Sequence, residues 1–336
     1  MTRLHIGRFT AVLVAWGSLL GAGCVGPARL ARTELRSTHD AQSLHARFFG
    51  VSTIFLADET SSILLDGFFT RPCVTGLVTG FKSNSARVTE GLRDLKLGRP
   101  EDVLLVAHSH HDHALDSAIV AARTGLVLHG SALTGVIATR QRPDYFPKNA
   151  ELPGPRTFEG LCDHAAFTRG RFTITPIETP HATAPWYIRM VEGLVWLPGV
   201  RDFPFDTNFC FHVAHPEAKI LIVPSAAPAR SGLRKLKADV VFLSIAYLAR
   251  QEPKDVDRYW CEYVIETGAR LVIPIHWDNL MGAPGQPLRE IPRPVDNIEK
   301  ALRLITERAA SCDVQIGFMP LNLPVLLPVD PAGAPK

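Results

Sequence analysis

Four histidines and one aspartate lie within six consecutive residues, His108-Ser109-His110-His111-Asp112-His113, directly after the apolar run Val103–Ala107. In extended backbone, side chains two positions apart point to the same side, so His108 and His110 can reach one metal ion. The turn that follows would direct Asp112 and His113 toward a second ion. Imidazole and carboxylate together suit zinc, iron or manganese. The spacing therefore predicts a metal centre at the end of a buried strand.

The segments around this motif alternate between strand-like and helix-like patterns. Ala114–Thr124 is predicted to be a helix that ends at Gly125, and Leu126–Leu128 to be the next buried strand. The other predicted strands are Arg47–Ala57, Ser61–Asp66, Val103–Ala107, Phe172–Ile177, Thr207–Val213, Lys219–Val223, Val240–Ile245 and Arg270–Ile275, and the other helices are Val88–Leu95, Lys254–Thr267 and Val295–Ala310. Strands that alternate with helices predict an α/β fold.

The motif H-x-H-x-D-H between a strand and a helix resembles that of the metallo-β-lactamase fold superfamily of metal-dependent hydrolases. The resemblance implies a four-layer αββα sandwich of two similar halves, although no internal repeat is visible in the sequence. The phrase Ile273-Pro274-Ile275-His276-Trp277 is similar to a motif of one subgroup. That subgroup includes ascorbate-6-phosphate lactonase-like and N-acyl-phosphatidylethanolamine phospholipase D-like proteins. We expect residues 47–330 to form one hydrolase domain of this fold.

The resemblance also implies a first set of metal ligands. His181 follows the strand Phe172–Ile177, where the family places the third histidine of its first metal. With His108 and His110 it would complete a three-histidine site. Many catalytic zinc ions have such a ligand set, which leaves an open position for water.

A second set is implied for a second metal ion. Asp112, His113 and His276 would form it, and His276 ends a predicted strand at the edge where α/β proteins place their ligands. Asp66 stands where similar proteins have an aspartate that orients the ligand histidines from behind. The alternatives are that His276 only caps its strand and that Asp66 is a simple turn carboxylate.

Ser225 departs from the family pattern. The family has an aspartate that bridges both metals, and Ser225, after the strand Lys219–Val223, occupies the corresponding position. A neutral hydroxyl is a poorer ligand than a carboxylate and does not offset the repulsion between two cations. Either two three-ligand sites share a hydroxide, with Ser225 in place of the bridging ligand, or one metal binds and Asp112 acts as general base. We expect weakened occupancy of the second site.

The implied activity is hydrolysis of an ester, lactone or phosphodiester in a small molecule or lipid. A metal lowers the pKa of bound water, and Asp112 would orient that water or accept its proton. Zn²⁺, one or two ions per chain, is the expected cofactor, with Mn²⁺ and Fe²⁺ as alternatives.

Two other functions compete with this hypothesis. One is an RNA-processing nuclease of the same superfamily, but a net charge of only +3 gives no electrostatic case for nucleic-acid binding. The other is a non-catalytic, metal-binding envelope lipoprotein whose site has degenerated with the loss of the bridging aspartate.

The beginning of the chain resembles an export signal. A short positive region precedes the apolar run Phe9–Leu20, which is too short to span a bilayer comfortably. Leu20-Gly21-Ala22-Gly23-Cys24 then resembles a bacterial lipobox, with glycine at 21 where leucine is preferred. We expect a signal peptide over 1–23, a tether over 24–46, and a lipid anchor at Cys24 that holds the protein in the bacterial envelope, facing the periplasm or the exterior. Ordinary secretion and an uncleaved anchor are the alternatives.

Three further patterns concern cysteines, loops and aromatic residues. The cysteines after Cys24 form no C-x-x-C pair, so a zinc ribbon is not expected, and most are predicted to be small buried residues.

Arg140–Gly160 and Asn279–Pro294 are rich in proline and glycine and are predicted to be loops over the active site. The aromatic residues after His181 either line a pocket for an acyl chain or form a β-hairpin packed into the core.

Overall fold

The computed structural model describes residues 33–37, 42–146, 157–194, 196–229, 233, 235–282, 288–293 and 295–327. The predicted signal peptide, Cys24 and most of the tether lie outside these ranges. The first strand begins at His45, within the predicted tether, and Glu34 forms an isolated β-bridge with Phe318. None of the described helices combines the length and apolar character needed to cross a bilayer.

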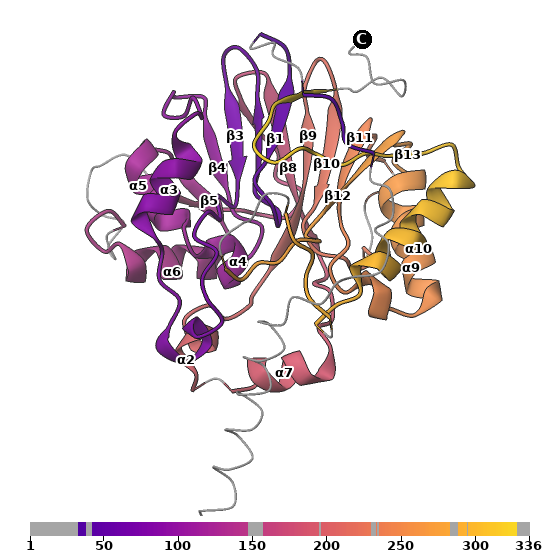
Figure 1. Ribbon diagram of the computed structural model, residues 1–336. Helices are drawn as coiled ribbons and strands as arrows, with labels where there is room; N and C mark the ends of the chain where they lie inside the picture. Colours follow the sequence, from indigo (N-terminus) through magenta and orange to yellow (C-terminus); the bar gives the residue numbers. More distant parts are fainter. Residues whose placement is uncertain are drawn as a thin grey trace, which may run out of the picture.

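Two seven-stranded sheets lie face to face (Figure 1). The first has the order β14-β1-β2-β3-β4-β5-β6 and the second β13-β12-β11-β10-β9-β8-β7. Each sheet joins three antiparallel pairs to three parallel pairs, so the two halves have matching topology. The strands are β1 His45–Phe48, β2 Ile54–Ala57, β3 Ser62–Leu65, β4 Val103–Leu105, β5 Leu128–Gly130, β6 Phe158–Gly160, β7 Phe167–Arg169, β8 Phe172–Thr179, β9 Asn208–Ala214, β10 Lys219–Val223, β11 Val240–Ser244, β12 Leu271–Ile275, β13 Gln315–Ile316 and β14 Val325–Leu326.

Helices cover the outer face of each sheet, which completes the predicted αββα sandwich (Figure 1). The first sheet is covered by α3 Ser85–Leu92, α5 Ser117–Thr124 and α6 Ala132–Gln141, and the second by α9 Pro253–Trp260 and α10 Ile298–Ala310. Shorter helices lie near the ends of the strands or extend α9: α2 Gly76–Thr79, α4 His111–Ala114, α7 Trp186–Glu192, α8 Pro198–Arg201, η1 Leu248–Arg250 and the π-helical turn η2 Cys261–Ile265.

Two hydrophobic clusters fill the space between these layers. The larger one lies between the sheets and under α9 and α10, and it joins Phe48 and Ile63 of the first sheet to Phe172 and Phe242 of the second. The other lies between the first sheet and the helices that cover it. Strands such as β11 are buried on both faces, which explains their continuous apolar runs.

Two predicted elements are each divided in the structure. The segment Arg47–Ala57 contains the end of β1 and all of β2, joined by a turn in which Gly50 and Val51 have positive φ. The predicted helix Ala114–Thr124 corresponds to α5 and shares only Ala114 with α4; at the break, Asp116 accepts hydrogen bonds from the backbone N–H groups of Phe69 and Thr70. Both divisions arise from contacts that a local sequence pattern does not contain.

Three further predictions were wrong in whole or part. Helices α7 and α8 occupy the region where a β-hairpin was the alternative to a pocket wall. Arg140–Gly160 contains the end of α6 and strand β6, and residues 147–156 lie outside the described ranges. Four of the five described cysteines are exposed because they lie in turns or on the outer side of helices, and only Cys210 is buried. No disulfide occurs among these five cysteines.

Candidate metal centre

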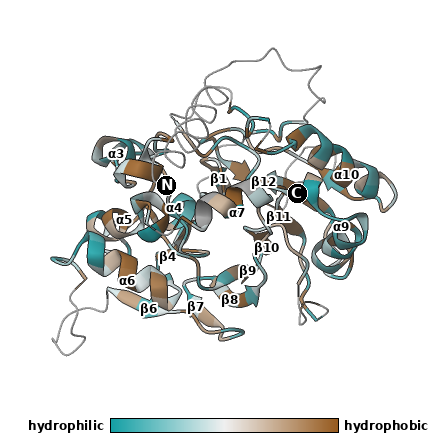
Figure 2. Ribbon diagram, turned by 90° about the horizontal axis from the view of Figure 1, so that it is seen from below, coloured by the Kyte–Doolittle hydropathy of each residue, from teal (hydrophilic) through white to brown (hydrophobic). Residues whose placement is uncertain are grey.

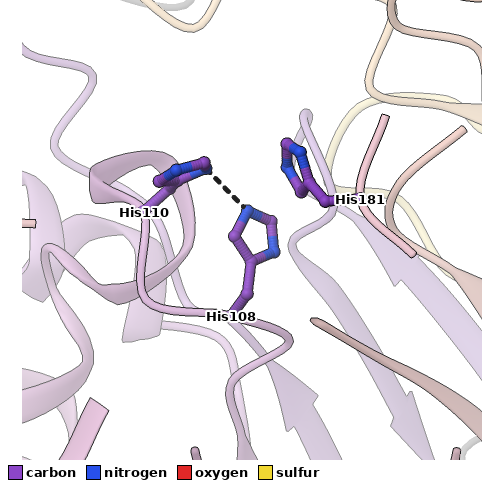
Figure 3. A group of neighbouring side chains, drawn as sticks. All are labelled: His108, His110 and His181. Carbon is purple, nitrogen blue, oxygen red and sulfur yellow. Dashed lines mark hydrogen bonds between the residues drawn. The ribbon is translucent and has the colours of Figure 1, made fainter. Parts of the chain in front are cut away.

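Three of the predicted ligand histidines point toward one another at the edge of the sandwich (Figure 3). His108 follows β4, His110 immediately precedes helix α4, and His181 follows β8. His108 Nε2 lies 3.1 Å from His110 Nδ1, and the His181 ring centroid is 4.7 Å from that of His108. One nitrogen of each ring lies within 4.8 Å of the others, which is close enough for a shared metal ion.

The second predicted group adjoins the first. His108, Asp112 and His113 also bring ligand atoms within 4.8 Å of one another, so His108 borders both groups. Asp112 Oδ2 lies 3.6 Å from His113 Nε2 and 3.2 Å from His276 Nε2. His276 follows β12 of the second sheet, whereas Asp112 and His113 lie in α4 beside the first. The structure thus brings all six predicted ligands together, from both halves of the molecule.

Asp66 lies behind His113, where the sequence analysis placed a carboxylate that orients ligands. Its Oδ2 is 2.7 Å from His113 Nδ1, and its Oδ1 accepts the Ala107 backbone N–H at 2.8 Å. A charged carboxylate only accepts hydrogen bonds, so His113 Nδ1 must carry the proton. When His113 is neutral, Nε2 therefore presents its lone pair to the cluster.

The donor atoms fit a divalent cation. His113 Nε2 is buried, faces the Asp112 carboxylate and has no hydrogen-bond partner. Buried polar atoms in proteins are nearly always paired, so this unpaired nitrogen needs an explanation. The distance from His113 Nε2 to Asp112 Oδ2 is 3.6 Å. A cation between them would bind both the His113 lone pair and the Asp112 carboxylate.

The ionisation of the site also suits metal binding. Burial and the neighbouring histidines lower the pKa of His110 to about 3 and that of His181 to about 4, and lower the pKa of His108 well below its usual value. These three rings are therefore neutral near pH 7 and keep a lone pair free. Burial opposes the charge on Asp112, but His113 and His276 hold the pKa of this carboxyl well below its usual range.

Ser225 has a supporting contact in the structure. It lies two residues beyond β10 and is 5% exposed. Its Oγ accepts the backbone N–H of Ala182 at 2.9 Å. The side chain thereby fixes the segment that carries His181, and its role as a replacement for the bridging ligand stays a prediction.

A cavity of about 520 Å³ opens beside the cluster. His110, Asp112, His181 and His276 form one side of it. Most of the remaining wall is apolar and includes Leu77 of α2, Ile188 of α7, Val200 of α8, Phe203, Leu280 and Met281. The predicted loop Asn279–Pro294 contributes to this wall as expected, whereas no described residue of Arg140–Gly160 does.

Two sets of contacts near the candidate site were not predicted from the sequence. His111, the motif histidine without an assigned role, stacks on Phe81 with ring centroids 4.2 Å apart and forms part of the wall. Arg71 and Asp278 form a buried ion pair at 2.9 Å, and Asp278 also accepts the Val51 N–H. This pair fixes the loop after His276, but its members are far apart in the sequence and follow no motif.

Known proteins resemble the chain in structure only. Neither a known sequence family nor a curated protein sequence matches it. A possible metal-dependent hydrolase from Veillonella parvula DSM 2008 aligns with a TM-score of 0.51 at 13% identity, covering 85% of this chain and 100% of its own. An isothiocyanate hydrolase from Delia radicum gut bacteria aligns with a TM-score of 0.50 at 13% identity, covering 84% and 98%. The diiron β-hydroxylase CmlA from Streptomyces venezuelae aligns with a TM-score of 0.50 at 12% identity, covering 85% of this chain and 54% of its own.

These likenesses concern the fold. Together with the paired sheets and their flanking helices, they confirm the α/β sandwich that the ligand motif implied. The finer subgroup suggested by the Ile273–Trp277 phrase stays a prediction.

Proposed function

We propose that this chain is a metal-dependent hydrolase that cleaves an ester, lactone or phosphodiester bond in a substrate with an apolar group. The observation that carries the proposal is the convergence of five histidines and Asp112 beside the apolar cavity of about 520 Å³. The Veillonella parvula protein and the isothiocyanate hydrolase, which share the fold, are described as hydrolases and support the reaction class.

Different residues would bind the metal, position the nucleophile and bind the substrate. A divalent metal held by the histidines and Asp112 would lower the pKa of a water molecule and polarise the oxygen under attack. Asp112 is ionised and buried at the cavity edge, where it would hold the nucleophile in place or accept its proton. The apolar wall would bind the acyl or alkyl part of the substrate and exclude bulk water.

Zn²⁺ is the cofactor we favour. The group His108, His110 and His181 is the three-histidine set of many catalytic zinc ions. Iron remains the main alternative, because the fold is shared with a diiron β-hydroxylase.

We further propose that the protein is exported and anchored in the bacterial envelope through Cys24, a proposal supported only by the sequence pattern of residues 1–24.

Metal analysis and a substrate panel test the activity. The chain from residue 25 onward is purified, its metal content is measured, and ester, lactone and phosphodiester substrates with short and long apolar groups are compared. We expect bound metal, turnover in at least one class, and, in His110→Ala, loss of turnover and of the metal of the three-histidine group. His164→Ala, at a histidine outside the cluster, serves as the matched control. A metal-free protein without turnover would overturn the proposal, and bound metal without turnover would favour the scaffold alternative.

The number of metal ions has its own test at Ser225. If this hydroxyl stands where a bridging carboxylate belongs, Ser225→Asp should raise the metal content from nearer one to nearer two ions per chain. Ser225→Ala removes the hydroxyl without adding a charge and should not raise it. An unchanged metal content in Ser225→Asp, in a variant that folds, would exclude this position as the bridging site.

A further inference from the structure

Exposed large apolar side chains are concentrated in the segments whose other residues line the cavity. Among the described residues, eight such side chains are exposed, and five belong to the segments that surround the cavity. They are Val78 (48% exposed), Trp186 (73%), Met190 (47%), Trp196 (65%) and Phe205 (42%), called here the docking rim. The other three, Val136, Ile265 and Leu323, are scattered in sequence and do not belong to these segments. Contiguous exposed apolar surface generally marks a binding site.

The docking rim and the cavity wall are built from the same short helices. Helix α2 packs directly on α8, since a Cβ at Gly199 would lie 2.6 Å from Leu77 Cα. Leu77, Ile188 and Val200 line the cavity, whereas exposed rim residues lie in or beside the same helices. Seen from below in Figure 2, α7 lies centrally, between the two halves of the sandwich.

Phe205 connects the rim to the metal centre. Its ring centroid lies 5.0 Å from that of His181 and 5.3 Å from that of His110, although 42% of the residue is exposed. Phe205 is thus at once exposed, part of the cavity wall and in contact with the candidate ligands. A partner on the rim would cover the entrance to the cavity.

The chemistry of the rim fits a lipid bilayer. Tryptophan is enriched at membrane interfaces, where its apolar ring is buried and its N–H stays among the headgroups. The exposed cation Arg189 lies in α7 and suits lipid phosphates, whereas Arg201 of α8 is paired with Asp202 at 2.9 Å. A bilayer also explains why exposed apolar residues and the apolar cavity wall belong to the same short helices, because lipids would enter the cavity without crossing water.

We propose that the docking rim rests on a phospholipid bilayer, so that the mouth of the cavity faces the membrane. Membrane binding itself does not depend on hydrolysis. Delivery of a lipid substrate from the bilayer is the part that rests on the proposed function. The rim would act in addition to any lipid on Cys24, so its effect should remain in a chain that lacks this cysteine.

Vesicle flotation with the chain from residue 25 onward tests the proposal. The vesicles are phosphatidylcholine alone or mixed with phosphatidylglycerol, and a second set carries brominated acyl chains that quench nearby tryptophans. We expect co-flotation and quenching, and Trp186→Ala/Trp196→Ala should weaken vesicle binding by about tenfold or more. The matched control is Val136→Ala/Leu323→Ala, which removes exposed apolar side chains outside the rim. Trp260 and Trp277 are buried, so they report little of the quenching.

The outcomes separate docking from catalysis. His110→Ala should lose metal and activity but still bind vesicles. Vesicle binding therefore tests the docking proposal even if the hydrolase proposal fails. No flotation, or flotation equal in the tryptophan variant and the wild type, would overturn the docking proposal. A wild-type chain that ignores vesicles but dimerises, and becomes monomeric in the tryptophan variant, would assign the rim to a second copy instead.

Discussion

At the residue scale, two residues of the metal centre, each directly after a strand, have the left-handed backbone conformation. Asp66 after β3 has φ 61° and His276 after β12 has φ 57°. For residues other than glycine this conformation costs about 1–2 kcal/mol. The Asp66 N–H donates to Leu105 O and the His276 N–H donates to Val51 O, both at 2.7 Å. Backbone strain therefore coincides with the site, as in many functional centres.

The contact between Asp66 and His113 yields a specific prediction. In Asp66→Asn, the amide oxygen still accepts the Ala107 N–H, so the amide nitrogen faces His113 Nδ1 as a donor. An amide donor at this place favours a His113 that accepts at Nδ1 and carries its proton on Nε2, which removes the lone pair that faces the cluster. Ser52 Oγ, 3.0 Å from Nδ1, is the competing acceptor for a proton on that nitrogen. We expect metal affinity to fall by about 10–100-fold. Competition with a chelator measures this loss directly.

A matched control exists elsewhere in the fold. Asp58 and His215 form another buried carboxylate–histidine pair, with 3.1 Å between Asp58 Oδ2 and His215 Nε2. Asp58→Asn should lower the thermal stability but leave the metal affinity unchanged. If Asp66→Asn kept the wild-type affinity, Asp66 would be only a structural carboxylate.

At the element scale, local patterns predicted the ligand loop but only part of the cavity wall. His108, His110, Asp112 and His113 lie within six residues after a buried strand, so their spacing alone brings them together. Helices α2, α7 and α8 have only four to seven residues, too few for a helical periodicity to emerge. The position of each depends on packing against partners that are distant in sequence, as where α2 meets α8.

The two ligand groups should lose metal at different pH. Protons compete with a metal only below the pKa of a ligand in the metal-free site. His110 and His181, with pKa values of about 3 and 4, are neutral down to that range. Burial would lower the pKa of His113, but Asp66 and Asp112 outweigh it and raise this pKa above its usual value. Protons therefore compete at His113 already near neutral pH.

Acid titration measures this difference. The protein is first loaded with excess metal, so that the weaker site beside His113 is also filled. As the pH falls from about 8 to about 4, we expect the metal beside His113 to leave first and the metal of the three-histidine group to persist to lower pH. Metal content after buffer exchange at each pH gives the two steps. His276→Ala should remove the early step and leave the late one. Release of all metal in a single step, or persistence of the metal beside His113, would contradict the assignment.

At the scale of the whole molecule, the metal centre and the core join the same two halves. His108, His110 and His113 lie beside the first sheet, whereas His181 and His276 follow strands of the second. The larger hydrophobic cluster likewise combines side chains of both sheets. A metal bound across the halves stabilises only the folded sandwich, so its removal should lower the melting temperature of the entire domain.

The shared core predicts that the two halves unfold together. Ile63 in β3 of the first sheet is 1% exposed and belongs to the cluster between the sheets. Ile63→Ala should cost about 2–5 kcal/mol of unfolding free energy. Trp260 and Trp277 are buried in the second half, whereas Trp186 and Trp196 are exposed, so the fluorescence change on unfolding reports mainly the second half.

The measurement compares two signals in denaturant. If the sandwich is one cooperative unit, tryptophan fluorescence and far-ultraviolet circular dichroism should keep coincident transitions in Ile63→Ala, both moved to lower denaturant. Ile265→Ala, at a residue 42% exposed in the second half, should move neither by more than about 0.5 kcal/mol. An unmoved fluorescence transition with a circular dichroism curve split in two would show that the halves unfold separately. The interface between the sheets would then be a weak contact between two independent units, and metal binding across it would carry more of the stability of the fold.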